Sequence, residues 1–382
     1  MKPRGKKSSV LLFVMLMIFA ASAILTAIAE YAAIALKSRA SAAAESKLRL
    51  GAYSALNAAI AVLEEYAEID GGIYAQSQGW GKPLADGRVS LPDGGEAEVE
   101  ISDESGKIPL RAVKADYVAK ILESLGMSEN DAQKYADLIS DWCDSDDSAS
   151  TFGAEAEDYG AFSPQPLNRP MESFRELAFI KDAAEIFFDE NGAPTELYKK
   201  FSSIFSLEPF SKVNLNAAEE DVLFAMMEAE QKDYDRSLYE ALRGDVGGIK
   251  DGIVWCKDSE ELQNRGVSEY PQQNSAFAAQ FLKISVTVKR GLGQYKLIAY
   301  YADPAQYSSL MSSNSTAAQT SAAASTSKSE ASRSAPSADS KQTSQQTTSA
   351  EGKFENGAIN SAAKQAAKRG SFKVVKIRES GR

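Results

Sequence analysis

The first seventy residues form one uninterrupted stretch of helix-compatible sequence, and its beginning is long and apolar enough to cross a membrane. Val10 to Ala29 carry no charge, and twenty residues that rise about 1.5 Å each span roughly the 30 Å hydrocarbon core. Lys2, Arg4, Lys6 and Lys7 precede this run, and such a cluster favours the cytoplasmic side. The sequence therefore predicts a single-pass membrane protein, the bulk of which is exported.

The predicted helix continues beyond the membrane-length segment. There is no Gly between Gly5 and Gly51 and no Pro between Pro3 and Pro83, and Ala, Leu, Glu and Lys dominate. An apolar stripe then recurs at steps of three and four residues, as in a helix packed on one face. It consists of Tyr53, Leu56, Ile60, Leu63 and Ala67. We expect a basic leader at 1–9 and one membrane and spine helix over 10–70.

Two simpler interpretations of the same segment remain open. A secretory signal usually has an apolar region of about 7–15 residues; this run is longer, although Ala27 to Ala29 offer small residues for cleavage. An ordinary single-span anchor would have the same hydropathy.

Composition restricts what the exported body can do. The chain has 53 acidic and 42 basic residues, a net charge of −11 and no histidine. Nucleic acid is therefore an unfavourable main partner, and catalysis that depends on His is excluded; we expect no enzyme. Cys143 and Cys256 could form a disulfide in an exported domain, or stay unpaired.

The body reads as strands, then helices, then strands. Alternation on both sides of a Pro-Asp-Gly-Gly turn predicts the first part of an antiparallel sheet at 85–106, and a second alternating hairpin predicts its closing part at 276–303. Between them, 107–275 has helical periodicity. The fold class is α+β: a long helix packed on an antiparallel sheet, with a large all-helical domain inserted between the strands. Further helices are expected near Val113–Leu125, after the cap Ser128, and at Met171–Lys181, Thr195–Phe205, Ala217–Gln231 and Arg236–Arg243.

The sequence after the closing hairpin is of another kind. Residues 304–352 are rich in Ser, Ala and Thr, which predicts a disordered linker. Residues 353–382 form a basic tail on an acidic protein. The tail could contact anionic lipid, cell-wall polymer or the chain's own body, or remain solvated without a fixed partner.

Carboxylates are densest just after the helix that Ser128 begins. So many acidic groups repel one another unless solvent or a cation neutralises them, and hard oxygen ligands suit structural Ca²⁺. The spacing is not that of an EF-hand; a solvated acidic loop and a carboxylate-based glycosidase are the alternatives. The candidate metal ligands are Asp141, Asp144, Asp146, Asp147, Glu155 and Asp158.

Several short motifs, in order across residues 1–302, resemble the general secretion pathway protein K family, the minor pseudopilins of type II secretion systems. After the stem they are Asp103-Glu104-Ser105-Gly106-Lys107-Ile108-Pro109-Leu110, Asp141-Trp142-x-Asp144-x-Asp146-Asp147, Gly153-Ala154-Glu155 with Tyr159, Asn168, the stretch from Ser173 to Leu177, and Val213-Asn214-Leu215-Asn216-Ala217-Ala218.

The resemblance implies a pilin-like fold and calcium held by the acidic loop of the inserted domain. It also implies an inner-membrane protein with its body in the periplasm, and a place at the tip of the pseudopilus after assembly. There the subunit would join other minor pseudopilins, the major pseudopilin and the inner-membrane assembly platform, and help start the fibre that exports folded proteins across the outer membrane. Processing of the prepilin-like leader after Gly5 would leave a methylated Lys6, with Val10 in place of the glutamate usual at the fifth position. The rival hypothesis is a membrane-anchored exported binding module for DNA or cell wall, in a pilus or competence-like system, because Asn214-x-Asn216-Ala217 is also similar to helix-hairpin-helix DNA modules.

Overall fold

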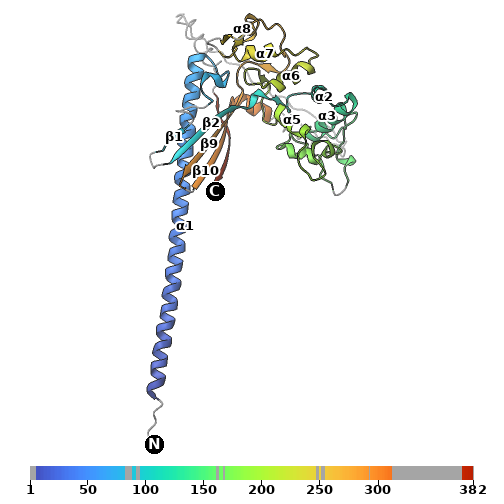
Figure 1. Ribbon diagram of the computed structural model, residues 1–382. Coiled ribbons are helices and arrows are strands. Elements are labelled where there is room, and N and C mark those ends of the chain that lie inside the picture. The colour runs from blue at the N-terminus through green and yellow to red at the C-terminus, as the bar shows by residue number, and fades with distance from the viewer. Residues whose placement is uncertain are drawn as a thin grey trace, which may run out of the picture.

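A single helix, α1 (Lys6–Asp70), runs the length of the molecule in the computed structural model (Figure 1). The structure describes residues 6–81, 88–91, 95–160, 163–166, 168–246, 249–250, 254–291, 293–311 and 372–381. The predicted continuous stem is confirmed, and α1 ends just before Gly71, whose φ of +81° favours glycine. Among the described residues, α1 is the one helix long and apolar enough to span a membrane.

The two halves of α1 have different surroundings. From Leu11 to Arg39 the side chains are exposed, with Ala35 partly covered. The second half packs on the sheet through small and apolar residues, of which Leu56 and Leu63 belong to the predicted stripe. The buried residues of α1 are Leu48, Ala52, Ala55, Leu56, Ala59 and Leu63. Among the described side chains of α1, those of the second half therefore gain the stability that burial within the chain provides.

The sheet has five antiparallel strands in the order β1-β2-β9-β10-β11. In β2, Ala97, Val99 and Ile101 are buried beneath α1, whereas alternate glutamates point to solvent, as predicted. The strands are β1 (Arg88–Ser90), β2 (Glu96–Asp103), β9 (Phe281–Arg290), β10 (Gly293–Ala302) and β11 (Lys373–Gly381). Both predicted hairpins are present; turn residues 92–94 of the first lie outside the described residues.

The C-terminal end of the predicted basic tail is a strand of this sheet. β11 pairs with β10 from Tyr295↔Gly381 to Ala302↔Lys373, with one irregularity between Tyr300 and Tyr301. The expectation of a tail without a fixed partner is therefore wrong for 373–381, and the chain's own body is the partner. The edge of β10 presents a row of backbone N–H and C=O groups with which this segment pairs. Of the predicted linker, 304–311 are helical, and 312–352 lie outside the described residues.

The domain inserted between β2 and β9 is mainly helical, but the prediction that it is all-helical is wrong. Its helices are α2 (Ala115–Ser124), α3 (Glu129–Cys143), α4 (Ala184–Phe187), α5 (Glu196–Ile204), α6 (Glu220–Ala229), α7 (Arg236–Leu242) and α8 (Ser259–Asn264), with 3-10 turns η3 (Glu104–Gly106), η4 (Ala156–Asp158) and η5 (Phe174–Ala178). Two-residue strands join distant segments: β3 (Ile108–Pro109) pairs with β4 (Phe205–Ser206), β5 (Val213–Asn214) with β8 (Ser275–Ala276), and β6 (Asp245–Val246) with β7 (Ile249–Lys250).

Local signals explain which predicted helices formed. Ser128 caps α3 by accepting a hydrogen bond from the Asp131 amide, as predicted. In place of the helix expected at Met171–Lys181, the chain forms the 3-10 turn η5 followed by the four-residue α4. Asp182, with a φ of +60°, interrupts the helical backbone between them.

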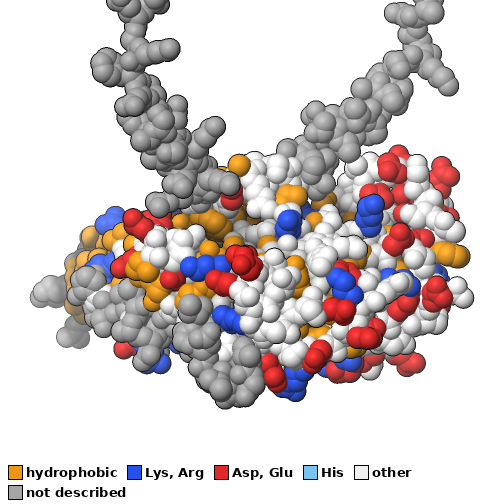
Figure 2. All heavy atoms as spheres, turned by 90° about the horizontal axis from the view of Figure 1, so that it is seen from above, with side chains coloured by type: hydrophobic (Ala, Val, Ile, Leu, Met, Phe, Trp, Pro, Cys, Tyr) orange, Lys and Arg blue, Asp and Glu red, His pale blue; other side chains and the backbone are white. Residues whose placement is uncertain are grey.

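Two main cores and one small one hold these parts together. One lies between α1 and the sheet, and the larger one lies inside the inserted domain. The small third core, Phe210, Phe281, Tyr300 and Ala302, sits where the inserted domain meets β9 and β10. Seen from above, acidic side chains are spread over the side of the molecule where Figure 1 places α2, α3 and α5 (Figure 2).

Candidate metal centre

The candidate site lies where α3 ends and the chain turns back toward the core. Asp141 is in the last turn of α3, and the Asp144 amide still donates to the Ser140 carbonyl. The chain then passes through exposed residues 146–149 and returns at Gly153 to Glu155. A helix end followed by a tight return places acidic groups from two segments on opposite sides of one small space.

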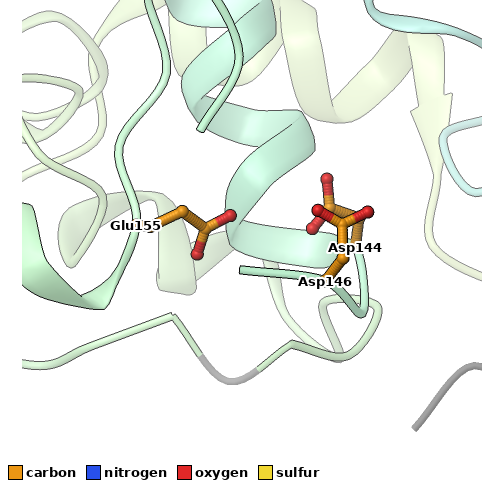
Figure 3. A group of neighbouring side chains, drawn as sticks. All are labelled: Asp144, Asp146 and Glu155. Atoms are coloured by element: carbon orange, nitrogen blue, oxygen red, sulfur yellow. The ribbon is translucent and has the colours of Figure 1, made fainter. Parts of the chain in front are cut away.

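Three of the six predicted ligands meet there. Oxygen atoms of Asp144, Asp146 and Glu155 lie within 4.8 Å of one another. Asp144 and Asp146 lie side by side on the turn after α3, and Glu155 extends toward them from the segment that returns to the core (Figure 3). Three carboxylates converge from positions 144, 146 and 155, a spacing with no simple period.

These carboxylates lack neutralising contacts. Glu155 is 5% exposed, and among the described residues neither of its oxygens, nor Asp144 Oδ1, has a hydrogen-bond partner. Burial, followed by the charges of Asp144 and Asp141, raises the pKa of Glu155 to about 7. Burial, followed by the charges of Asp146 and Asp141, raises the pKa of Asp144 to about 6. Unpartnered buried carboxylates are costly without a cation or a proton.

The other predicted ligands build the loop around the group. Asp141 is fully buried and accepts hydrogen bonds from the amide and hydroxyl of Ser150 at 2.9 and 2.6 Å. Asp147 accepts from Asn168 Nδ2 at 3.0 Å, and Asp158 accepts from the Glu155 amide at 3.1 Å. Their carboxylates are thus engaged within the protein.

One supporting residue was missed by the sequence interpretation. Asp137, one helical turn before Asp141, is 5% exposed and accepts from the Phe152 amide at 3.2 Å and from Gln133 Nε2 at 2.7 Å. Two acidic residues four positions apart share one face of a helix. The four-residue spacing of Asp137 and Asp141 was the sequence signal that one face of α3 could accept hydrogen bonds from the acidic loop.

Gly153 is required for the approach of Asp141. A Cβ at this position would lie 1.7 Å from Asp141 Oδ2, so Gly153→Ala must displace the carboxylate that orders Ser150. We expect this variant to lose several °C of thermal stability, a cost of about 1–3 kcal/mol, and to bind Ca²⁺ more weakly. Gly160→Ala is the control, because its Cβ would meet only Ser163 Oγ at 3.5 Å. Equal melting temperatures for the two variants would contradict the assignment.

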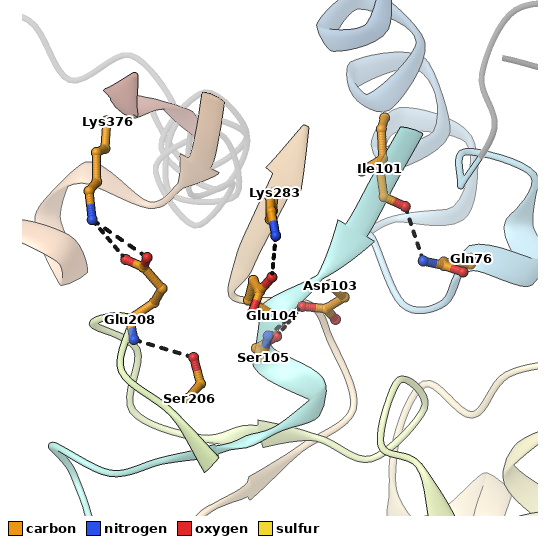
Figure 4. Close-up of polar contacts among 9 residues, drawn as sticks. All are labelled: Gln76, Ile101, Asp103, Glu104, Ser105, Ser206, Glu208, Lys283 and Lys376. Carbon is orange, nitrogen blue, oxygen red and sulfur yellow. Dashed lines mark hydrogen bonds and ion pairs between the residues drawn. The ribbon is translucent and has the colours of Figure 1, made fainter. Parts of the chain in front are cut away.

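A second group of predicted motif residues forms the junction between the sheet and the inserted domain (Figure 4). Asp103 Oδ1 accepts from the amide and hydroxyl of Ser105 at 2.9 and 2.5 Å. Its Oδ2 accepts from Asn214 Nδ2 at 2.7 Å, and the same amide group donates to the Tyr74 carbonyl at 2.7 Å. Burial raises the pKa of Asp103 to about 6. Asn214 therefore ties the end of the sheet to the segment that follows the stem.

The second asparagine of the motif has a similar buried position. Asn216 Nδ2 donates to the carbonyls of Cys256 and Phe277, and its Oδ1 accepts from the Cys256 amide. Asn214 and Asn216 are 0% and 3% exposed. The interpretation of this motif as a DNA contact is wrong for these side chains, because they are used inside the protein.

Neither the disulfide nor the processing site gains support. Cys143 and Cys256 are free thiols; Cys143 ends α3, whereas Cys256 is held by Asn216. The structure therefore has the second of the two expected alternatives, in which the cysteines stay unpaired. Gly5 lies outside the described residues, as do the side chains of Lys6 and Val10.

Comparisons with known proteins show which proteins this chain is similar to. Residues 100–188 match the family model of type II secretion system (T2SS), protein K. A type II secretion system protein K from Pseudomonas aeruginosa is 29% identical over 163 residues, which cover 40% of this chain and 45% of that protein. The match thus spans less than half of the relative. The chain is also similar to a chain of the crystal structure of the GspK-GspI-GspJ complex from enterotoxigenic Escherichia coli, with a TM-score of 0.45, 13% identity, and coverage of 67% of this chain and 90% of that one.

Proposed function

We propose that the chain is a protein K minor pseudopilin at the tip of a type II pseudopilus, because residues 100–188 match the family model of type II secretion system (T2SS), protein K. The family is structural rather than enzymatic. The observation that carries the proposal is the 65-residue helix α1, apolar and exposed in its first half and packed on an antiparallel sheet in its second.

The two halves of α1 suit two successive environments. The exposed apolar half fits the inner membrane before assembly and the packed stems of a fibre afterwards. The inserted domain stands at the end of the molecule remote from the N-terminus (Figure 1), where a bulky domain would obstruct stacking unless no subunit followed. Val10, the fifth residue after Gly5, also supports a terminal position, because no neighbour above would need a carboxylate partner.

The proposed partners follow from this position. The chain would join other minor pseudopilins in a hetero-oligomeric tip complex, contact the major pseudopilin and the assembly platform, and help initiate the fibre that exports folded proteins across the outer membrane. The acidic balance of the sequence, 53 acidic to 42 basic residues, and the buried Asn214 and Asn216 favour this role over DNA binding.

We further propose that Asp144, Asp146 and Glu155 hold a Ca²⁺ ion. The donor set fits, because carboxylate oxygens are preferred Ca²⁺ ligands and the oxygens of Glu155 lack other partners among the described residues. Bound calcium would supply the positive charge that these groups lack. The chain's own contribution is to hold the three carboxylates together through the Asp141 and Asp137 hydrogen bonds to Ser150 and Phe152.

The proposal predicts a particular mature protein. The full chain, purified from membranes of its own cells, should begin at an N-methylated Lys6 and co-purify with other pilin-like subunits after mild cross-linking. Intact mass spectrometry and sequencing of the cross-linked partners measure both. Gly5→Leu should leave the leader attached and abolish co-assembly, whereas Gly51→Ala, in the same helix, should be processed normally. An intact Met1 or a start at Glu30 in the wild-type chain would count heavily against a pseudopilin.

A further inference from the structure

The C-terminal strand β11 is anchored on the α1 side of the sheet by a carboxylate. Glu379 accepts a hydrogen bond from Tyr53 Oη at 2.5 Å and pairs with Arg49 Nη2 at 3.3 Å. Both partners belong to α1, at the level where the stem emerges from the sheet. One residue of β11 therefore recognises two adjacent turns of the stem helix.

Other residues anchor the same strand to the inserted domain and to β10. Lys376 Nζ pairs with Glu208 Oε2 at 3.2 Å and lies 5.1 Å from the centre of the Tyr300 ring (Figure 4). At the start of the segment, the ring of Phe372 packs on Tyr301, with centroids 5.5 Å apart. Three residues of the segment thus have complementary partners: Phe372 packs on an aromatic ring, Lys376 pairs with a carboxylate, and Glu379 pairs with a guanidinium.

Without β11, the edge of β10 would be an unpaired strand edge that is prone to aggregation. A ten-residue strand with Leu297, Ile298 and Tyr300 along it would present unpaired backbone groups, the usual template for joining another sheet. β11 replaces that edge with one that carries Lys373, Lys376 and Arg378 and a register irregularity. Charge and irregularity are the features by which natural proteins protect sheet edges.

All of these contacts are made by residues 372–381. In the sequence, 60 residues, 312–371, separate Met311 from Phe372, and a chain of that length can reach at most about 200 Å. The β11 strand of a neighbouring copy would make the same contacts with β10, α1 and Glu208. Exchange of β11 between two copies therefore replaces each lost contact by an identical one. Whether β11 binds its own chain or a neighbouring chain is then decided by the local concentration of chains.

We propose that the outer edge of β10 is a strand-acceptor site for the C-terminal strand, and that it binds this strand from a second copy of the chain as well as from its own. The acceptor comprises β10 with Arg49, Tyr53 and Glu208. The ligand is an extended segment with an aromatic residue, a cation and an acid in the spacing of Phe372, Lys376 and Glu379. The membrane supplies the high local concentration, because every copy is anchored in the same plane. This inference does not depend on the proposed position at the fibre tip.

A cysteine pair in full-length chains tests exchange directly. Lys296 and Ser380 are exposed and are directly paired between β10 and β11. Chains with Lys296→Cys and chains with Ser380→Cys, reconstituted together in vesicles and oxidised, should form disulfide-linked dimers. Gln294→Cys with Ser380→Cys is the register control, because Gln294 is exposed on the same face of β10 but lies two residues out of register. Wild-type chains report any reaction of Cys143 and Cys256.

A charge exchange provides an independent measurement. Glu208→Lys and Lys376→Glu each place like charges together when the strand stays in its own chain, but a mixture of the two variants restores both pairs by reciprocal exchange. We expect roughly three- to tenfold more dimer in the mixture than in either variant alone, and none of this gain in the double variant Glu208→Lys with Lys376→Glu. Absence of the 296–380 dimer from mixed chains, or an equal yield from the 294–380 control, would overturn the proposal.

Discussion

Removal of calcium is expected to destabilise the wild-type chain while leaving Glu155→Gln almost unaffected. At a free calcium concentration about 100 times the dissociation constant, binding adds about 2.7 kcal/mol to the free energy of unfolding, and a chelator removes it. Glu155→Gln removes one ligand and also one buried negative charge. With calcium the variant should therefore be less stable than the wild type, and in chelator above pH 7 it should be more stable.

The sign of the pH dependence follows from the raised pKa. The pKa of Glu155 in the folded chain is about 7, above its ordinary value of 4.5, so between these values the folded state holds a proton that the unfolded state releases. Stability without metal is therefore greatest below pH 4.5 for this group and is lost as the pH rises through 7. The loss is on the order of 3 kcal/mol. Bound calcium favours the charged form and should flatten this dependence.

Thermal melts of the full chain in detergent, at pH 5 to 8 with calcium or chelator, measure both effects. Glu157→Gln is the matched control, because Glu157 is an exposed carboxylate two residues away and should respond to calcium like the wild type. Two outcomes would contradict the proposed calcium site. One is a wild-type melting temperature that does not change on chelation, and the other is a Glu155→Gln variant that is less stable than the wild type under every condition.

The stem and hairpins could be predicted because their signals are local. The stem has no proline between Pro3 and Pro83 and is rich in helix-forming residues, which favours a long helix. Each hairpin, β1–β2 and β9–β10, is recognised from alternating apolar residues on either side of a short turn. The C-terminal strand has no such signal. Its apolar residues are Val374, Val375 and Ile377, and the adjacent pair Val374-Val375, at the register irregularity, breaks the alternation. Its strand conformation depends on the edge of β10 and on Glu208, which are far away in sequence.

The acidic centre was predictable as a region but not as a set of ligands. Composition marks 141–158 as unusual, but which carboxylates converge depends on the turn between Asp144 and Glu155. Asp141 cannot be distinguished from Asp144 by residue type; it is the packing of its carboxylate against Gly153 that commits Asp141 to the loop and leaves Asp144 facing Glu155. Such a distinction requires the three-dimensional path of the chain.

The inserted domain is joined to the sheet by backbone contact as well as by side chains. A Cβ on Gly106 would lie 2.6 Å from the Ala217 carbonyl oxygen, so η3 and the Asn216 segment are in direct contact. Lys283 pairs with Glu104 at 3.4 Å across the same region (Figure 4). The core between α1 and the sheet is separate from the core of the inserted domain, so this junction connects the two parts of the body.

Asn216→Ala is therefore expected to be among the most destabilising single substitutions in the body. It would leave the amide and carbonyl of Cys256 and the carbonyl of Phe277 without their partners at 2.8, 2.7 and 2.6 Å. Unsatisfied buried groups cost about 1–3 kcal/mol each, so the total should reach about 3–5 kcal/mol.

Two further variants serve as controls for the loss of stability in Asn216→Ala. Asn216→Asp should not rescue stability, because a carboxylate would face the Cys256 and Phe277 carbonyls in place of a donor. Asn130→Ala, at an exposed position on α3, should change stability by no more than about 0.5 kcal/mol. Denaturant unfolding of the full chain, combined with limited proteolysis, measures the effect, and the inserted domain should become susceptible first. A cost below about 1 kcal/mol for Asn216→Ala would show that water can replace these bonds and that the junction is held by packing alone.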